Sequence, residues 1–366
     1  MPRVLFAALK NKMSKFLVDK YTSLEPYTPG EQPKERKFLK LNTNESPFPP
    51  SPKAIALAAE EAKRLMLYSD PECKELSAKM AETLGVSVEN VILTNGSDEV
   101  LNFAFMAYCD ENCPAVFPDI TYGFYKVFAA VNALPYEEIP LLEDFSMPLD
   151  ALKNAKGTLF IANPNAPTGL LLPLSEIEGL VASDPSRIVV VDEAYIDFGG
   201  ESAVSLIGKY DNLLVTGTFS KSRSMAGARL GFGVGSPALI ADLHRIRYST
   251  NPYNVNRMTA AAGVGALSDK EYFEENCKKI IEARAYAAAE LSALGFEMTD
   301  SKANFLFARH EKIGGEVLYK ALREKGVLVR HFSGARIKEY NRITVGSMEE
   351  MQTLVRLIKE ILEEKL

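Results

Sequence analysis

The sequence is poor in histidine and cysteine, which limits the metal and disulfide chemistry it can support. It contains three histidines, at positions 244, 310 and 331, and none belongs to an H-E-x-x-H pattern, so we expect no histidine-rich metal site. The four cysteines include no C-x-x-C pair, and so few in a chain of 366 residues are typical of free thiols in a reducing compartment. They are Cys73, Cys109, Cys113 and Cys277.

The sequence also lacks an excess of basic charge and any long apolar run. It carries 42 lysines and arginines against 48 aspartates and glutamates, a formal net charge of −6, which argues against a broad nucleic-acid-binding surface. No apolar run reaches the roughly 18 residues that a membrane-spanning helix needs, so we expect none. The apolar stretch 4–9 is shorter than the core of a secretory signal, and the cytoplasm is the expected location.

What is present is the composition of a folded protein with two domains. Hydrophobic residues make up 47% and charged residues 25%, close to average globular usage. From about residue 90 to 250, short apolar segments typical of strands alternate with helix-like segments, whereas helices and strands are mixed after about 255. We therefore predict an α/β fold with a large, mainly parallel-sheet domain at 46–250 and a smaller α+β domain at 251–366. An N-terminal arm at 1–45 is expected to pack with the small domain.

Local patterns place the expected elements. Strands are predicted at 91–94, 115–117, 158–161, 188–191, 213–215 and 230–234. Ser175 with Glu178 and Ser347 with Glu350 have the spacing of capping boxes, each predicting the beginning of a helix.

Polar and aromatic residues follow five of the predicted strands. Because ligands of a parallel sheet bind beyond the carboxyl ends of its strands, these residues would gather at one edge. They are Ser97 and Asp98, Tyr122, the segment 163–169 (N-P-N-A-P-T-G), Asp192 and Tyr195, and lastly Ser220, Lys221 and Arg229. Taken singly, most have an ordinary explanation: a helix N-cap at 96–98, a tight turn at 163–169, or a surface lysine at 221. Asp192, at the end of an apolar strand, needs a cation or hydrogen-bond donors.

Together, these residues meet the requirements of one cofactor, pyridoxal phosphate. Lys221 supplies an amine for its aldehyde, and Asp192 an anion for its ring nitrogen, so that the ring can accept electrons. Tyr122 offers an aromatic face, and Tyr195 could reach the phenolic oxygen if the strand bends. The phosphate group would be held by Ser97, Asp98, Ser220 and Arg229.

The same residues belong to motifs that resemble a known family. The chain is similar, from about Met13 onward, to the fold-type I pyridoxal-phosphate aminotransferases, and most closely to the histidinol-phosphate aminotransferase family. The motifs that carry the resemblance are L-E-P-Y-T-P-G-E-Q (24–32), L-N-T-N-E-S-P (41–47), G-S-D-E (96–99), N-P-N-A-P-T-G (163–169), D-E-A-Y (192–195), T-F-S-K (218–221), A-G-A-R-L-G (226–231) and R-I-T-V-G (342–346).

The resemblance implies roles for further residues. Tyr68 matches a tyrosine that the partner subunit donates to the cofactor phosphate, which makes a homodimer an expectation. Arg342 matches the arginine that binds the substrate carboxylate, although an exposed strand arginine is the ordinary alternative. Arg330 matches an arginine for the substrate phosphate, and Tyr27 a tyrosine of the N-terminal arm at the same pocket. An asparagine of the 163–169 turn, with Asn165 preferred, would contact the phenolic oxygen together with Tyr195.

The implied reaction is amino transfer between L-glutamate and imidazole-acetol phosphate, giving 2-oxoglutarate and L-histidinol phosphate in histidine biosynthesis. An aromatic or broad-specificity aminotransferase and a threonine-phosphate decarboxylase share much of this motif set. A catalytically inactive cofactor-binding module is a further alternative, against which the set of Lys221, Asp192 and Arg342 argues.

Three features depart from the family pattern. Ala166 occupies the position of a second asparagine before P-T-G, so either Asn163 or Asn165 supplies the contact or it is missing. Arg223 stands two residues after Lys221, where a neutral residue is commoner, and is either an extra cation beside the phosphate or a solvent-facing side chain. Residues 1–12 precede the recognisable start, and Met13 is the expected initiator.

Overall fold

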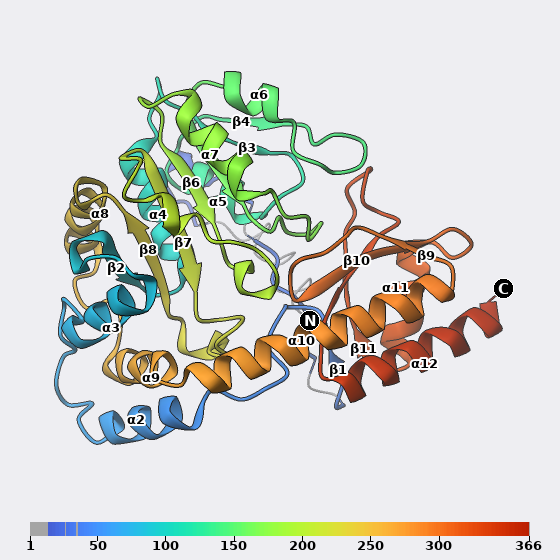
Figure 1. Ribbon diagram of the computed structural model, residues 1–366. Helices are drawn as coiled ribbons and strands as arrows, with labels where there is room; N and C mark the ends of the chain where they lie inside the picture. Colours follow the sequence, from blue (N-terminus) through green and yellow to red (C-terminus); the bar gives the residue numbers. More distant parts are fainter. Residues whose placement is uncertain (1–13, 26, 34–35, 366) are drawn as a thin grey trace.

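The computed structural model describes residues 14–25, 27–33 and 36–365. The initiator expected at Met13 lies outside these residues. The molecule has a larger part built on one sheet and a smaller part, coloured orange and red in Figure 1. The long helix α10 (Lys270–Ala293) runs from the first part to the second (Figure 1).

Seven strands of the described chain form the large sheet, in the order β2-β8-β7-β6-β5-β3-β4. Their bounds are β2 (Val91–Thr94), β3 (Ala115–Pro118), β4 (Tyr136–Ile139), β5 (Thr158–Ala162), β6 (Val189–Asp192), β7 (Leu213–Thr218) and β8 (Gly231–Gly235). Neighbouring strands from β7 to β4 are parallel, whereas β8 is antiparallel to both β7 and β2. The mainly parallel sheet that the sequence predicts is confirmed, with one strand reversed.

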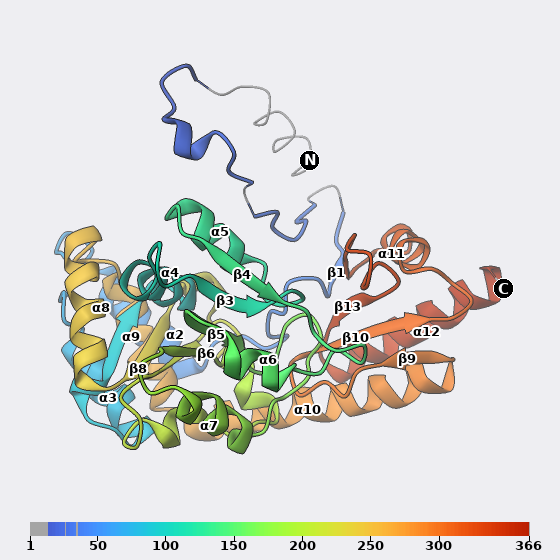
Figure 2. The same cartoon turned by 90° about the horizontal axis from the view of Figure 1, so that it is seen from above.

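Helices cover both faces of this sheet (Figure 2). One face packs against α4 (Ser97–Tyr108), α5 (Phe124–Val131) and α8 (Pro237–Thr250), and the other against α6 (Leu149–Asn154) and α7 (Leu174–Ser183). Successive side chains of the central strands point to opposite faces of the sheet. Val190 packs with the helices of the first face, whereas Val189 and Val191 pack with those of the second. Burial on both sides explains the apolar run of residues 189–191 in β6.

Three helices close one end of the large part. They are α2 (Pro52–Ala62), α3 (Lys74–Leu84) and α9 (Arg257–Leu267), which share a core with β2. Proline begins α2 at its first position, and Ser51 caps it by accepting the Ala54 N–H at 3.1 Å. Although α9 follows the boundary expected at residue 250, it packs against α2 and α3. The division into domains at 46–250 and 251–366 stays a prediction.

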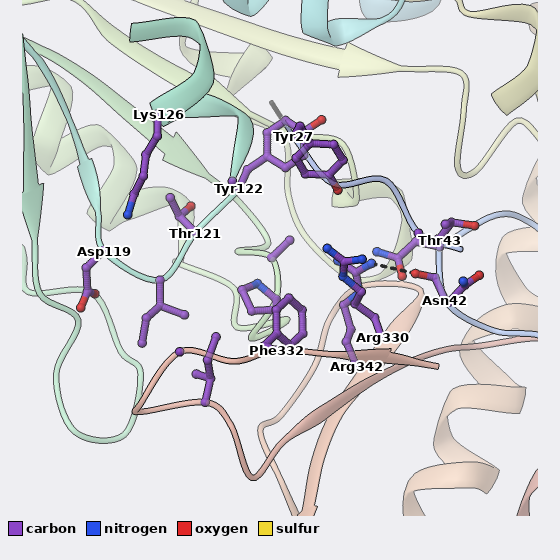
Figure 3. Close-up of a pocket in the computed structure, with 18 of the residues that line it drawn as sticks. Tyr27, Asn42, Thr43, Asp119, Thr121, Tyr122, Lys126, Arg330, Phe332 and Arg342 are labelled. Atoms are coloured by element: carbon purple, nitrogen blue, oxygen red, sulfur yellow. Dashed lines mark hydrogen bonds between the residues drawn. The ribbon is translucent and has the colours of Figure 1, made fainter. Parts of the chain in front are cut away.

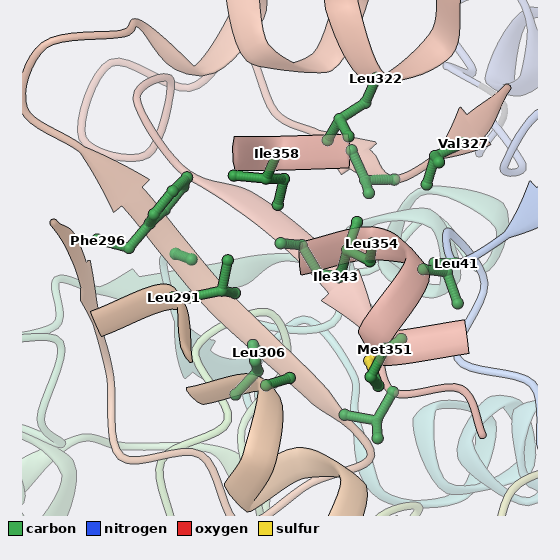
Figure 4. Close-up of a cluster of buried hydrophobic side chains, with 14 of the residues drawn as sticks. Leu41, Leu291, Phe296, Leu306, Leu322, Val327, Ile343, Met351, Leu354 and Ile358 are labelled. Carbon is green, nitrogen blue, oxygen red and sulfur yellow. The ribbon is translucent and has the colours of Figure 1, made fainter. Parts of the chain in front are cut away.

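The smaller part places helices against a four-stranded antiparallel sheet of order β12-β13-β10-β9. Its elements are β9 (Phe296–Met298), β10 (Phe305–His310), β12 (Arg330–His331), β13 (Asn341–Thr344), α10, α11 (Gly315–Glu324) and α12 (Met348–Lys365). A separate parallel pair joins β1 (Leu39–Lys40) to β11 (Val327–Leu328), so the end of the N-terminal segment lies on this part. Leu41 extends into its apolar core, beside Leu354 and Ile343 (Figure 4).

The two predicted capping boxes have different outcomes. At the beginning of α12, the Ser347 N–H donates to Glu350 Oε2 at 2.8 Å and the Glu350 N–H to Ser347 Oγ at 3.2 Å, as predicted. The box at Ser175 is wrong, because α7 already begins at Leu174 after Pro173. No helix in the described part of the chain combines the length and apolar character needed to cross a bilayer.

Candidate active site

The carboxyl ends of β5, β6 and β7 meet the beginning of α4 at one edge of the large sheet. Here lies a cavity of about 270 Å³, which we call the inner cavity. Eight of the ten predicted cofactor residues line it: Ser97, Asp98, Tyr122, Asp192, Tyr195, Ser220, Lys221 and Arg229. Parallel strands bring them together because their carboxyl ends all point to this edge.

Lys221 projects into the inner cavity from the turn that follows β7. Its Nζ donates to the carbonyl oxygen of Thr43 at 3.2 Å. Burial, followed by the nearby Arg342 guanidinium, lowers the pKa of Lys221 to about 8. At pH 7 about a tenth of the amine is therefore neutral, which is the form that acts as a nucleophile or base.

Asp192 ends β6 and is 5% exposed. Its Oδ2 accepts from the Tyr125 hydroxyl at 3.3 Å, and its Oδ1 accepts from the Ala194 N–H at 3.2 Å. Burial, and secondly the charge of Asp98, raises the pKa of Asp192 to about 6. No ion pair involves this carboxylate among the described residues, so it is suited to a cationic group brought into the cavity.

The beginning of α4 forms an anion cup with Arg229. Gly96 has φ 80°, a left-handed conformation that glycine adopts without strain, and the N–H groups that open α4 have no partner within the helix. Gly231 packs so closely that a Cβ there would lie 2.2 Å from Ser97 N. Arg229 Nη2 lies 2.9 Å from Asp98 Oδ2. Helix N–H groups and a guanidinium together make a site for a phosphate.

Two tyrosines line the space between the cup and Lys221. The Tyr122 hydroxyl donates to Asp98 Oδ1 at 2.7 Å, whereas the Tyr195 hydroxyl accepts from Asn44 Nδ2 at 3.0 Å. Burial raises the pKa of both tyrosines, so both are protonated at neutral pH.

A second, outer cavity of about 600 Å³ shares Tyr122, Tyr195 and Lys221 with the inner one. Arg330 and Arg342 lie next to each other on its wall, with Tyr27 nearby (Figure 3). Each arginine donates to one backbone carbonyl, Arg330 to Thr28 at 3.1 Å and Arg342 to Asn42 at 3.2 Å.

The two arginines keep hydrogen-bonding capacity for a ligand. Neither forms an ion pair within the described chain, and the Nε of Arg342 is buried without a partner. Two cations without counter-ions beside an amine are suited to a substrate with two anionic groups.

The predicted contact of Asn165 with the cofactor stays a prediction, and the structure places the Asn165 side chain among internal partners. Its amide nitrogen donates to the Ile120 carbonyl at 2.9 Å and to Thr168 Oγ1 at 3.0 Å, and its oxygen accepts from Thr121 Oγ1 at 2.8 Å. The side chain is therefore occupied inside the protein and lines neither cavity, whereas Ala166 lines both.

Tyr68 and Arg223 also lie outside both cavities of this chain. Tyr68 is 79% exposed and stacks on Tyr253, with ring centroids 4.6 Å apart. The guanidinium carbon of Arg223 lies 4.0 Å from the ring centroid of Phe273, and its Nη1 donates to the Ala266 carbonyl, so it is directed away from the cup.

Tyr125 and Asn44 are among the polar residues of the site that were not predicted from the sequence. Tyr125 lies on α5, three residues after Tyr122, and its hydroxyl donates to Asp192 Oδ2, a spacing that could have indicated it. Asn44 belongs to the 41–47 motif, but it reaches Tyr195 from a segment 151 residues away, for which the sequence offers no signal.

Comparisons with known proteins agree with this geometry. Residues 36–358 match the family model described as aminotransferase class I and II. The histidinol-phosphate aminotransferase of Brachyspira hyodysenteriae is 47% identical over 353 residues, covering 96% of this chain and 100% of the relative. The enzyme of the same name from Clostridium acetobutylicum is 47% identical over 349 residues, covering 95% and 99%.

Solved structures show the same fold. A histidinol-phosphate aminotransferase from Sinorhizobium meliloti, in complex with pyridoxal-5'-phosphate, superposes with a TM-score of 0.88 over 97% of this chain and 99% of that chain, at 23% identity. Aspartate aminotransferase from Thermotoga maritima has a TM-score of 0.78 at 21% identity, covering 89% and 92%. The family match spans both parts of the fold and includes every residue that lines the inner cavity. This chain therefore belongs to the class I and II aminotransferase family.

Proposed function

We propose that the chain transfers an amino group between L-glutamate and imidazole-acetol phosphate, forming 2-oxoglutarate and L-histidinol phosphate, with pyridoxal phosphate as cofactor. The observation that carries the proposal is the shared boundary of the two cavities. A partly buried amine, Lys221, lies between an anion cup and a pair of arginines without counter-ions. The name shared by the 47% identical relatives supports the choice of substrate.

The residues of the inner cavity fit the cofactor in chemistry and size. Asp192 is a buried carboxylate that lacks a cation, as a protonated ring nitrogen requires. Gly96 has φ 80°, which disfavours any residue with a side chain, and a Cβ there would displace Arg229, because it would lie 2.6 Å from Nη2. Lys221 would bind the aldehyde, Arg229 and the first N–H groups of α4 the phosphate. When bound, the cofactor supplies an electron sink for the charge left by removing the substrate α-proton.

Residues of the chain itself would move the proton and bind the substrate. Lys221 Nζ, with its lowered pKa, would accept the α-proton of the amino donor and return a proton in the opposite half-reaction. Asp192 would keep the ring nitrogen protonated, and Tyr195 would donate to the phenolic oxygen. In the outer cavity, Arg342 would bind the carboxylate of glutamate, while Arg330 and Tyr27 would bind the phosphate ester.

We also propose that two copies of the chain form a homodimer, each donating Tyr68 to the other's phosphate cup. Tyr68 is exposed next to Leu65, Met66 and Leu67, which are 58%, 80% and 53% exposed. Residues 14–25 project away from the rest of the molecule (Figure 2). An apolar surface and a projecting segment are both typical of an interface that a partner covers. The four cysteines are free thiols, which favours the cytoplasm as the location.

A substrate panel tests the proposed reaction. The protein loaded with pyridoxal phosphate is mixed with imidazole-acetol phosphate, phenylpyruvate or threonine phosphate, with glutamate as amino donor for the two keto compounds. We expect the phosphate-bearing keto compound to give the highest kcat/KM. Higher activity with phenylpyruvate would favour an aromatic aminotransferase, and carbon dioxide released from threonine phosphate would favour a decarboxylase.

Arg330→Gln tests whether Arg330 binds the substrate phosphate while Arg342 binds the carboxylate of glutamate. We expect the KM for imidazole-acetol phosphate to rise at least about tenfold, because a charge-assisted contact is lost, while the KM for glutamate stays within a factor of two. Arg336→Gln is the matched control, since Arg336 lines the outer cavity but is paired with Asp119 at 3.4 Å. An equal rise for both substrates would contradict this division of roles.

A further inference from the structure

Asn44 is buried next to the cofactor-facing Tyr195 and uses all of its polar groups. It is 1% exposed and has φ 55°, a left-handed conformation that asparagine tolerates better than most residues. Its Nδ2 donates to the Tyr195 hydroxyl at 3.0 Å. Its Oδ1 accepts from Thr344 Oγ1 at 3.1 Å, and its carbonyl oxygen accepts from Asn304 Nδ2 at 3.1 Å.

The contacts of Thr344 determine which way the Asn44 amide faces. The backbone N–H of Asn44 donates to Thr344 Oγ1 at 3.0 Å, so this hydroxyl already acts as an acceptor there. Its single proton is then directed to Asn44 Oδ1. Because Oδ1 is held by Thr344, it is the NH₂ group of Asn44 that must face Tyr195.

This orientation determines the role of the Tyr195 hydroxyl. An NH₂ group can only donate, so Tyr195 accepts from Asn44 and keeps its own proton for another acceptor. Tyr195 lines the inner cavity, where that proton can be directed. The 163–169 turn offers no competing donor, because Asn163 is bonded to the backbone of Leu172 and Ala166 presents a methyl group.

We propose that Asn44 is a positioning residue, which aims the hydroxyl proton of Tyr195 at the phenolic oxygen of the cofactor and is itself oriented by Thr344. The inference rests on the proposed function, because it needs pyridoxal phosphate in the inner cavity. It gives this chain one fixed donor, Tyr195, where the family's asparagine has been replaced by Ala166.

The test is a spectroscopic pH titration of the loaded protein rather than an activity assay. The visible absorption of the cofactor bonded to Lys221 changes when the linking nitrogen gains or loses its proton. A donor to the phenolic oxygen lowers the pH at the midpoint of this titration because it stabilises the negative charge on that oxygen. In Thr344→Val the amide of Asn44 can turn its oxygen to Tyr195 and take up the proton. We expect the midpoint to rise by about 1 pH unit, the effect of losing a charge-assisted hydrogen bond. Thr344→Ser keeps the hydroxyl and should stay within about 0.3 unit of the parent.

A double-mutant cycle distinguishes positioning from general disturbance. Tyr195→Phe should raise the midpoint by at least as much as Thr344→Val, and the two together should give no more than Tyr195→Phe alone. Equal midpoints for Thr344→Val and Thr344→Ser, or a full additional shift in the Tyr195→Phe background, would overturn the inference. If Thr344→Val does not fold, Asn44→Asp takes its place in the same cycle, since its carboxylate accepts the Tyr195 proton. A parent protein without visible absorption would refute the proposed function itself, whereas a normal band with unmoved midpoints refutes only the role of Asn44.

Discussion

Replacing Gly231 with alanine tests whether the beginning of α4 holds the cofactor phosphate. The new Cβ would lie 2.2 Å from Ser97 N and 2.3 Å from the carbonyl carbon of Gly96, both backbone atoms that cannot swing aside. Reaching van der Waals contact requires the strand and the helix terminus to separate by about 1 Å. A hydrogen bond of about 2.9 Å from these N–H groups would then exceed the useful range.

The expected loss can be worked out from these contacts. Hydrogen bonds to a charged group contribute about 1.5–3 kcal/mol each. Losing one or two of them costs about 3 kcal/mol, or roughly a 100-fold increase in the Kd for pyridoxal phosphate. The Kd is measured by titrating the apoprotein and following the absorbance of the bound cofactor.

Gly227→Ala is the matched control, because Gly227 lies only four residues before Gly231, in the short 3-10 turn Ala226–Ala228, and a Cβ there meets nothing within 4 Å. Thermal unfolding of both apoproteins shows whether either variant is simply misfolded. Values of Kd for the two variants within threefold of each other, with both folded, would refute the role assigned to the helix terminus.

Other predictions concern the amine, the buried carboxylate and the small-domain core. The rate constant for cofactor uptake by the apoprotein should increase about tenfold per pH unit below pH 8 and level off above it, because neutral Lys221 is the nucleophile. A rate constant, measured by stopped-flow absorbance, that still increases toward pH 10 would contradict this. Asp192→Asn should lower kcat by about 100-fold or more while the cofactor still binds, because the ring nitrogen loses its anion; a fall below threefold in steady-state assays would count against it. Leu354→Ala, at a fully buried position of α12, should lower the free energy of unfolding by about 3 kcal/mol in urea titrations, whereas the exposed Lys359→Ala should change it by less than about 0.5 kcal/mol.

The sequence predicts the fold well where burial is complete. The predicted strands 188–191 and 213–215, which became β6 and β7, are continuously apolar, and a short apolar run bounded by turn residues is consistent with a strand buried on both faces. The edge strand β4 was not predicted, because its sequence Y-E-E-I carries two glutamates and Tyr136 is 45% exposed. The direction of β8 is not readable from its alternating glycines, since both orientations satisfy the same pattern.

The site was predictable to the extent that it follows strand ends. Lys221 and Asp192 can be assigned to the site from their positions alone. A charged side chain directly after an apolar strand is costly to bury unless it has a partner or a ligand. Local sequence does not say which residue of a turn faces a cavity, and the Asn165 amide satisfies the Ile120 carbonyl instead of a ligand. The position of Asn44 in the site depends on the pairing of β1 with β11, a contact between segments nearly 300 residues apart in the sequence.

That pairing has a mechanical consequence. Leu39 and Lys40 are fixed to the edge of the smaller lobe, and α2 begins in the larger lobe only after Ser51. The segment between them reaches the inner cavity, where the carbonyl of Thr43 accepts from Lys221 Nζ. Because this segment is anchored at β1 on one side and at the Ser51 cap of α2 on the other, contacts in both parts of the molecule hold the Thr43 carbonyl beside Lys221.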